Sequence, residues 1–164
     1  MPVCLSLIST DLPIWFVTET AGTLYQKDDD RFHLLLTDPS VPDRTSAQMQ
    51  AEGSHENESS QRVQTTEAPR LLWLEISPYR VVMTMQGNGK FSYRHFWEQG
   101  VYGLSRYWLQ SDSLGTNGHL RLRNFTRSLV LKRDPLPRHL RLEYELWSNK
   151  VQLGNYVLNL EIQH

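Results

Sequence analysis

The sequence contains very little cysteine and no long apolar run, and each shortage narrows the class of protein. A single cysteine, Cys4, among 164 residues cannot form a disulfide within the chain, which favours a reducing compartment. No apolar stretch approaches the roughly 20 residues that a membrane-spanning helix needs. We therefore expect a cytoplasmic protein with no membrane partner, whose single domain covers residues 1–164 and buries its own core.

Catalytic and metal-binding patterns are also missing. The chain has no Gly-x-Ser-x-Gly, Gly-x-x-x-x-Gly-Lys or Gly-x-Gly-x-x-Gly motif, so neither a nucleophile elbow nor a phosphate-binding loop is indicated. The six histidines stand singly on separate predicted elements, whereas a zinc site needs three or four converging ligands. We expect no metal, no other cofactor and no enzymatic activity.

Alternating apolar and polar residues dominate what is there. In residues 139–162, Leu140, Leu142, Tyr144 and Leu146 alternate with charged side chains, and a similar alternation returns after a polar break. Successive side chains of a strand point to opposite faces, so this segment predicts a hairpin with one buried and one wet face. No apolar stripe of helical period runs for ten residues or more. The sequence predicts an all-β fold, an antiparallel up-and-down β-barrel of about eight to ten strands whose closure removes exposed edges.

Two segments are expected to connect strands. Residues 37–69 are rich in proline, glutamine, serine and acidic residues, with almost nothing to bury, and they predict a long mobile loop inserted within the domain. Gly87-Asn88-Gly89 predicts a tight turn between two strands, because glycine and asparagine suit consecutive positive-φ positions.

Four segments together carry a family resemblance. They are residues 22–25 (Gly-Thr-Leu-Tyr), residues 72–87 with Glu75-Ile76-Ser77, residues 96–100 followed by Leu104 and Tyr107, and residues 140–146 with 153–158. In order and spacing they resemble the YwiB-like proteins, bacterial calycin-type β-barrels of uncharacterised function. The resemblance spans nearly the whole chain apart from residues 37–69. It implies a lipocalin-like or fatty-acid-binding-protein-like barrel, and it carries over no catalytic residue.

Aromatic residues and arginines gather between residues 91 and 108. They can form the wall of a pocket in which an arginine holds a carboxylate or phosphate, or they can simply fill the barrel, since aromatics are favoured in strands. Arg127 lies in phase with Leu129 and Leu131 and would anchor a ligand if it points inward; a solvated outer stripe with Arg121 and Arg123 is the alternative. The candidate ligand-binding residues are Tyr93, Arg94, Trp97, Tyr107, Arg127 and Tyr144.

The charge is unevenly distributed along the chain. Residues 70–150 contain thirteen basic and six acidic residues, although the net charge of the whole chain is -1. Basic residues with interleaved aromatics are typical of surfaces that bind single-stranded nucleic acid, and an outward Phe96 or Trp147 beside the arginines would favour this interpretation. Two hypotheses follow. The first is a small amphipathic or acidic ligand inside the barrel. The alternative is an interaction module whose basic face binds nucleic acid or an acidic protein partner.

Overall fold

The computed structural model describes residues 1–37, 70–87, 91–110 and 117–164. These residues form ten antiparallel strands, each paired with its neighbours in the chain, and β1 pairs with β10 to close the barrel. The prediction of an antiparallel up-and-down β-barrel is confirmed. The strands are β1 (Pro2–Ser9), β2 (Trp15–Asp28), β3 (Arg31–Thr37), β4 (Leu71–Ile76), β5 (Arg80–Gln86), β6 (Phe91–Glu98), β7 (Tyr102–Gln110), β8 (Asn117–Arg133), β9 (Pro137–Ser148) and β10 (Val151–Ile162).

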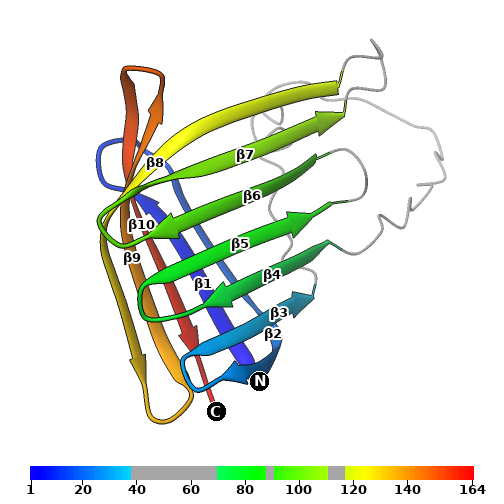
Figure 1. Ribbon diagram of the computed structural model, residues 1–164. Helices are drawn as coiled ribbons and strands as arrows, with labels where there is room; N and C mark the ends of the chain where they lie inside the picture. The colour runs from blue at the N-terminus through cyan, green and yellow to red at the C-terminus, as the bar shows by residue number, and fades with distance from the viewer. Residues whose placement is uncertain (38–69, 88–90, 111–116) are drawn as a thin grey trace, which may run out of the picture.

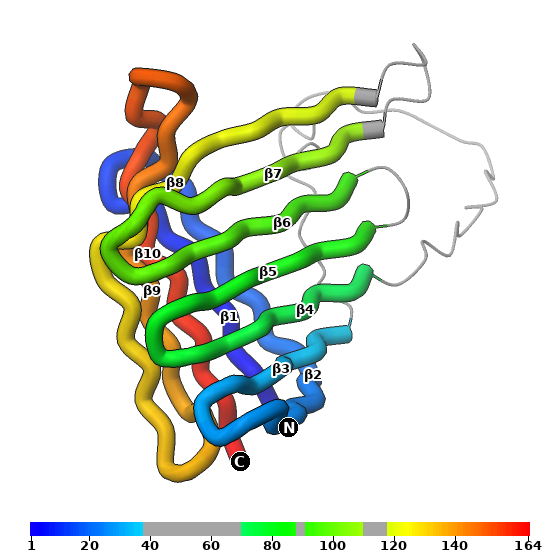
Figure 2. Tube along the Cα trace, viewed as in Figure 1, coloured from blue at the N-terminus to red at the C-terminus, as the bar shows by residue number. Residues whose placement is uncertain are grey.

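The barrel has two walls, joined on one side by the long strand β8. Strands β3 to β7 form one wall, and β1, β2, β9 and β10 form the opposite wall (Figure 1). The first part of β8 pairs with β7 and its second part pairs with β9, with a register shift between Thr126 and Ser128. A β-bulge of this kind bends a strand, which lets β8 pass from one wall to the other. Both termini lie at the same end of the barrel (Figure 2), where Gln163 N donates to Pro2 O at 3.1 Å.

The core consists of inward side chains at every second position of the strands. Leu34 and Leu36 on β3, and Leu140 and Leu142 on β9, are almost completely buried, as the alternation predicts. Burying a leucine side chain in this way contributes about 1.5–3 kcal/mol. Glu145 departs from the pattern, because it is only 7% exposed although the alternation puts it on the wet face.

The burial of Glu145 has a local cause. On the outer face of β9 its carboxylate forms an ion pair with Arg127 and accepts a 2.9 Å hydrogen bond from Trp147 Nε1. These two long side chains cover the carboxylate and also supply its ion pair and hydrogen bond. A charged group can be buried when it has such partners. The expectation that Glu145 is solvated is therefore corrected.

Two predicted connections fall largely outside the described residues. Of the predicted loop 37–69, only Thr37 is described, at the end of β3; of the predicted turn at 87–89, only Gly87 is described. In the described ranges, no helix is long and apolar enough to cross a membrane.

Candidate functional site

Four of the predicted site residues converge inside the barrel. Trp97 is fully buried on β6, and its ring centroid lies 5.1 Å from that of Tyr144 on β9. Tyr93 and Tyr107 also contact each other, with ring centroids 6.2 Å apart. His95 lies between these pairs, stacked on Trp97 at 4.8 Å and edge-on to Tyr107 at 5.3 Å. The aromatic candidates therefore share one place, and there they pack on one another.

A buried set of polar side chains lies beside these rings. His95 Nδ1 and Ser105 Oγ share a 2.8 Å hydrogen bond, and Asn124 Nδ2 donates to the same Ser105 Oγ at 2.9 Å. Burial lowers the pKa of His95 to about 3, so the imidazole is neutral at pH 7. Burial also raises the pKa of Tyr93 to about 12 and that of Tyr144 well above its usual range. The polar groups that hydrogen-bond beside these rings, from His95, Ser105 and Asn124, are neutral.

Three buried polar atoms in this region have no hydrogen-bond partner among the described residues: Trp97 Nε1, Asn124 Oδ1 and Thr126 Oγ1. Gly103 makes the region compact, because a Cβ there would collide with the carbonyl oxygen of Phe96 and come within 2.9 Å of Asn124 Oδ1. Sequence reasoning missed Ser105, Asn124 and Thr126. The available signal was a polar residue at an inward position of a strand.

Arg94 and Arg127 lie outside the barrel. Arg94 is exposed on the outer face of β6, and the side chain of Arg127 is 61% exposed. The register shift after Thr126 explains Arg127, because the extra residue keeps Thr126 and Leu129 buried while Arg127 turns outward. Arg127 is therefore an outward arginine, as in the alternative interpretation, and it does not anchor a ligand in the barrel.

The outer face of β6, β7 and β8 carries a row of arginines that the strand register assembles. Arg94 lies directly opposite Arg106, and Arg106 lies directly opposite Arg121. We call these three residues the arginine row. None of the three has a carboxylate or hydrogen-bond partner within the described part of the chain. Like charges directly opposite one another destabilise a sheet. The alignment of the three arginines therefore does not contribute to the stability of the barrel.

Aromatic side chains flank the arginine row on both sides. Trp108 stacks on His119 of the neighbouring strand, with ring centroids 5.5 Å apart. Beyond the other side of the row, the ring of Tyr102 lies 5.0 Å from that of Phe125 and 5.1 Å from the guanidinium carbon of Arg123. An open hollow of about 430 Å³ lies between Tyr102 and the arginine row, lined by Arg94, Phe96, Tyr102, Gly103, Leu104 and Arg106.

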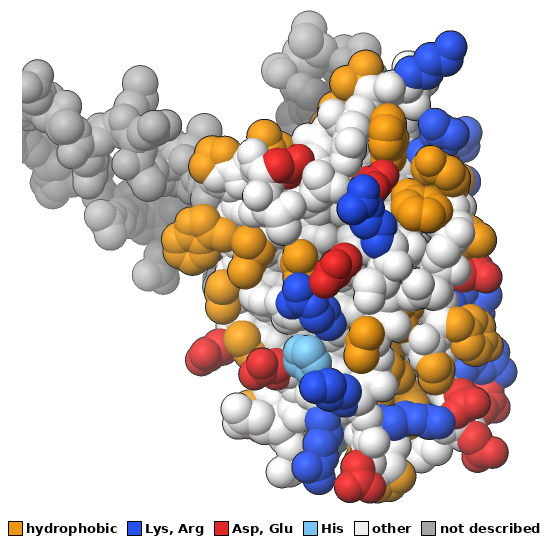
Figure 3. Space-filling view, turned by 90° about the vertical axis from the view of Figure 1, so that its left-hand side faces the viewer, with side chains coloured by type: hydrophobic (Ala, Val, Ile, Leu, Met, Phe, Trp, Pro, Cys, Tyr) orange, Lys and Arg blue, Asp and Glu red, His pale blue; other side chains and the backbone are white. Residues whose placement is uncertain are grey.

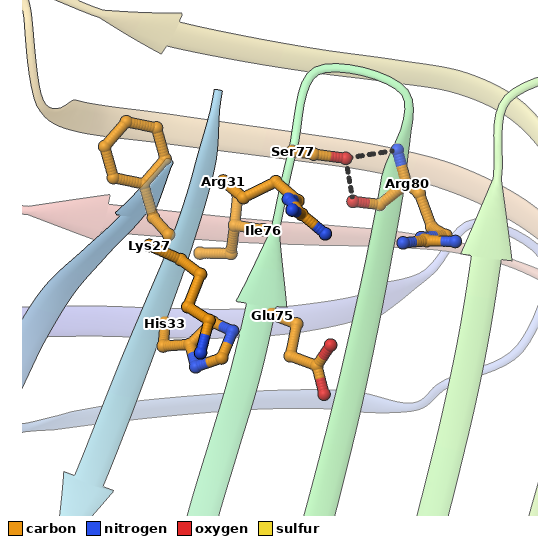
Figure 4. Close-up of a pocket in the computed structure, with 8 residues that line it drawn as sticks. Lys27, Arg31, His33, Glu75, Ile76, Ser77 and Arg80 are labelled. Carbon is orange, nitrogen blue, oxygen red and sulfur yellow. Dashed lines mark hydrogen bonds between the residues drawn. The ribbon is translucent and has the colours of Figure 1, made fainter. Parts of the chain in front are cut away.

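A second hollow adjoins this surface. It measures about 210 Å³, and Lys27, Arg31, His33, Glu75, Ser77 and Arg80 line it together with Phe32 and Ile76 (Figure 4). Ser77 holds the turn beside it, donating from Oγ to Arg80 O at 2.9 Å. The guanidinium carbon of Arg80 lies 5.9 Å from the ring centroid of Phe96, so Arg80 links this hollow to the one beside the arginine row. Here the cations are partly balanced, because Arg31 pairs with Asp28 and Glu75 shares the hollow.

Several cations elsewhere on the barrel have acidic partners. On the side shown in Figure 3, some lysine and arginine side chains lie next to aspartate or glutamate, and Arg31, Arg127, Arg133 and Arg141 form ion pairs. Arg141 on β9, for example, donates from Nη2 to Glu143 Oε1 at 2.9 Å. The outward described positions of β7, and those of β8 as far as Phe125, hold no carboxylate. In the described ranges no group of three or more His, Cys, Asp or Glu side chains is placed to hold a metal ion.

The fold and surface together define a closed ten-stranded antiparallel β-barrel with a cation-rich outer wall. The crystal structure of the ywiB protein from Bacillus subtilis matches it with a TM-score of 0.55 at 14% sequence identity. The match covers 99% of this chain and 92% of that one. At such an identity the likeness shows a YwiB-like fold and nothing of function. No protein-family model matches the chain, and no curated protein does.

Proposed function

We propose that this protein is a non-enzymatic interaction module that binds an anionic partner through the arginine row. The observation that carries the proposal is the register: Arg94, Arg106 and Arg121 face one another on three neighbouring strands without a carboxylate among the described residues. Such a row is unfavourable in the free protein. An anionic partner relieves this repulsion, and guanidinium groups suit phosphate and carboxylate geometry.

A binding site on the outer face of the barrel is better supported than one in the interior. Phe96 and Trp147 both point outward beside arginines: Arg80 lies over the ring of Phe96, and Trp147 lies opposite Arg123. An outward Phe96 or Trp147 beside arginines is the feature that favours a surface for single-stranded nucleic acid. The hollows described above are lined mostly by outer residues, and none of Tyr93, Trp97, Tyr107 and Tyr144 lines either of them.

Charge-removing variants test this function. Arg94→Gln, Arg106→Gln and Arg121→Gln each remove one member of the row, and Arg138→Gln removes the same charge from an exposed position on β9. The probes are inorganic polyphosphate and a single-stranded oligonucleotide at about 50 mM salt. Each phosphate contact on a single strand contributes about 0.7 to the slope of log K against log salt, so each row variant should bind roughly eightfold more weakly.

The control sets the limits of that test. Arg138→Gln should bind within about twofold of the parent protein, because only its contribution to long-range attraction is lost. Equal weakening by Arg138→Gln and by the row variants would show that net charge, and not this site, attracts the probe. Failure of the parent protein to bind either polyanion at low salt would remove the proposal.

We also propose a second candidate function, a small amphipathic ligand within a calycin-type barrel in the cytoplasm. Its support is the set of inward aromatics with three unpartnered polar atoms, Trp97 Nε1, Asn124 Oδ1 and Thr126 Oγ1, because buried polar groups normally have partners. The neutral hydrogen-bonding groups of Ser105 and Asn124 beside the rings favour a polar but uncharged group on the ligand. Native mass spectrometry tests it: a reproducible mass excess that is lost on denaturation supports an interior ligand, and a bare chain argues against one.

A further inference from the structure

We infer that the anionic partner is a single-stranded nucleic acid whose bases stack on Trp108 and Tyr102 while its phosphates contact the arginine row. This inference rests on the proposed function and specifies the partner. It starts from the order of outward side chains on β7, which is Tyr102, Leu104, Arg106, Trp108. A cation therefore lies between two aromatic rings on one strand face. Arg94 on β6 and Arg121 on β8 add a positive charge on each of the two neighbouring strands.

The spacing suits a short stretch of nucleotides. Trp108 lies six positions after Tyr102 in the extended strand, which corresponds to roughly 20 Å along β7. A nucleic-acid strand that follows β7 crosses the arginine row at Arg106, which lies four residues from Tyr102 and two from Trp108. A contact of this length holds about four nucleotides, at the lower end of the site sizes of β-barrel domains that bind single strands.

Both rings are exposed and held in place. Tyr102 is 56% exposed and Trp108 is 37% exposed. Trp108 stacks on His119 with an angle of 22° between the ring planes, and Tyr102 contacts Phe125 and Arg123. Rings that neighbouring side chains already support lose little conformational freedom when a base stacks on them. They are therefore suited to act as stacking platforms.

The chemistry distinguishes this partner from other polyanions. An acidic protein segment needs the arginines but gains no stacking from exposed aromatic rings. A duplex keeps its bases stacked inside, and its grooves show only their edges. A single strand offers both the phosphates for the arginine row and the base faces for Trp108 and Tyr102.

Aromatic variants with controls of the same residue type test the inference. Trp108→Ala and Tyr102→Ala remove the proposed platforms. Trp15→Ala and Tyr25→Ala remove exposed rings from β2, on the opposite wall of the barrel. The probes are an oligothymidylate, polyphosphate and polyglutamate of similar charge. Loss of one stacked base should weaken oligothymidylate binding about five- to 150-fold. Polyphosphate binding should stay within about twofold, and the β2 variants should bind all probes as the parent does.

Two further measurements separate a lost contact from a lost fold. Trp108→Phe keeps a ring, so it should recover most of the oligothymidylate affinity that Trp108→Ala loses. Oligothymidylate should also change the tryptophan fluorescence of the parent protein, and Trp108→Ala should abolish most of that change. Thermal unfolding of each variant confirms that the barrel remains folded.

The probes tell apart failure of this inference and failure of the proposed function. The row variants could weaken binding of polyphosphate and oligothymidylate alike while Trp108→Ala changes neither. That result would support anion binding by the arginine row and refute base stacking. If polyglutamate binds more tightly than oligothymidylate, the partner is an acidic protein segment and the nucleic-acid inference is overturned. If no probe binds at low salt, both proposals fail.

Discussion

His95 should make the stability of the barrel depend on pH. Burial lowers the pKa of its imidazole from the ordinary 6.5 to about 3, and its Nδ1 bonds to Ser105 in a region without charge. Above pH 6.5 the ring is neutral in both the folded and the unfolded chain, so it adds no pH dependence. Below pH 6.5 the unfolded chain binds a proton that the folded chain does not. The free energy of unfolding therefore falls as the pH falls, until the folded protein also takes up the proton near pH 3.

The size of the effect follows from the two pKa values. One proton bound only by the unfolded chain changes the free energy of unfolding by about 1.4 kcal/mol per pH unit. Between pH 7.5 and pH 5 the loss amounts to about 2 kcal/mol. This is a large part of the stability of a typical single domain, about 5–15 kcal/mol.

Urea unfolding of the parent protein and of His95→Gln measures this loss. Glutamine cannot titrate but can still hydrogen-bond to Ser105. The other five histidines and all the carboxylates are common to both proteins. Between pH 7.5 and pH 5 the free energy of unfolding of the parent should fall by about 2 kcal/mol more than that of the variant. Parallel pH profiles would refute the assignment of His95 as a buried neutral group.

Two further substitutions have defined outcomes. Gly103→Ala places a methyl group against the Phe96 carbonyl oxygen and should lower the free energy of unfolding by about 1–3 kcal/mol. The urea midpoint measures this loss. An unchanged midpoint would mean that β6 and β7 do not approach each other so closely at Gly103. Arg106→Thr removes the central charge of the arginine row and adds a β-branched residue that strands favour. It should therefore raise the free energy of unfolding by about 0.2–1 kcal/mol at low salt. The gain should be smaller at 1 M salt, because salt screens the repulsion between the arginines. A loss of stability at low salt would argue that Arg106 has a favourable partner.

The period-two pattern was sufficient to predict most of the fold. Residues 139–162 form the predicted hairpin, because burial of Leu140, Leu142 and Leu146 needs only the alternation that the sequence displays. Glu145 was mispredicted, because its burial depends on Arg127, which reaches it through a bulge in another strand. Sequence periodicity contains no information on such a bulge.

The arginine row could not be assembled from the sequence. The sequence indicated Arg94 and Arg106 among aromatics and Arg121 in a solvated stripe, but the alignment of the three depends on the register between three strands. A shift of one residue in either pairing would send one arginine to the other face of the sheet. Likewise, Ser105 and Asn124 become a hydrogen-bonded pair inside the barrel only because β7 and β8 align as they do.

The salt dependence of oligothymidylate binding tests the role of the arginine row most directly. Affinities of the parent protein, of the triple variant Arg94→Gln/Arg106→Gln/Arg121→Gln and of Arg138→Gln would be measured from about 50 to 500 mM salt. Three lost phosphate contacts should reduce the slope of log K against log salt by about 2, while Arg138→Gln keeps the slope of the parent. An unchanged slope in the triple variant, with binding retained, would contradict the claim that these three arginines contact the phosphates.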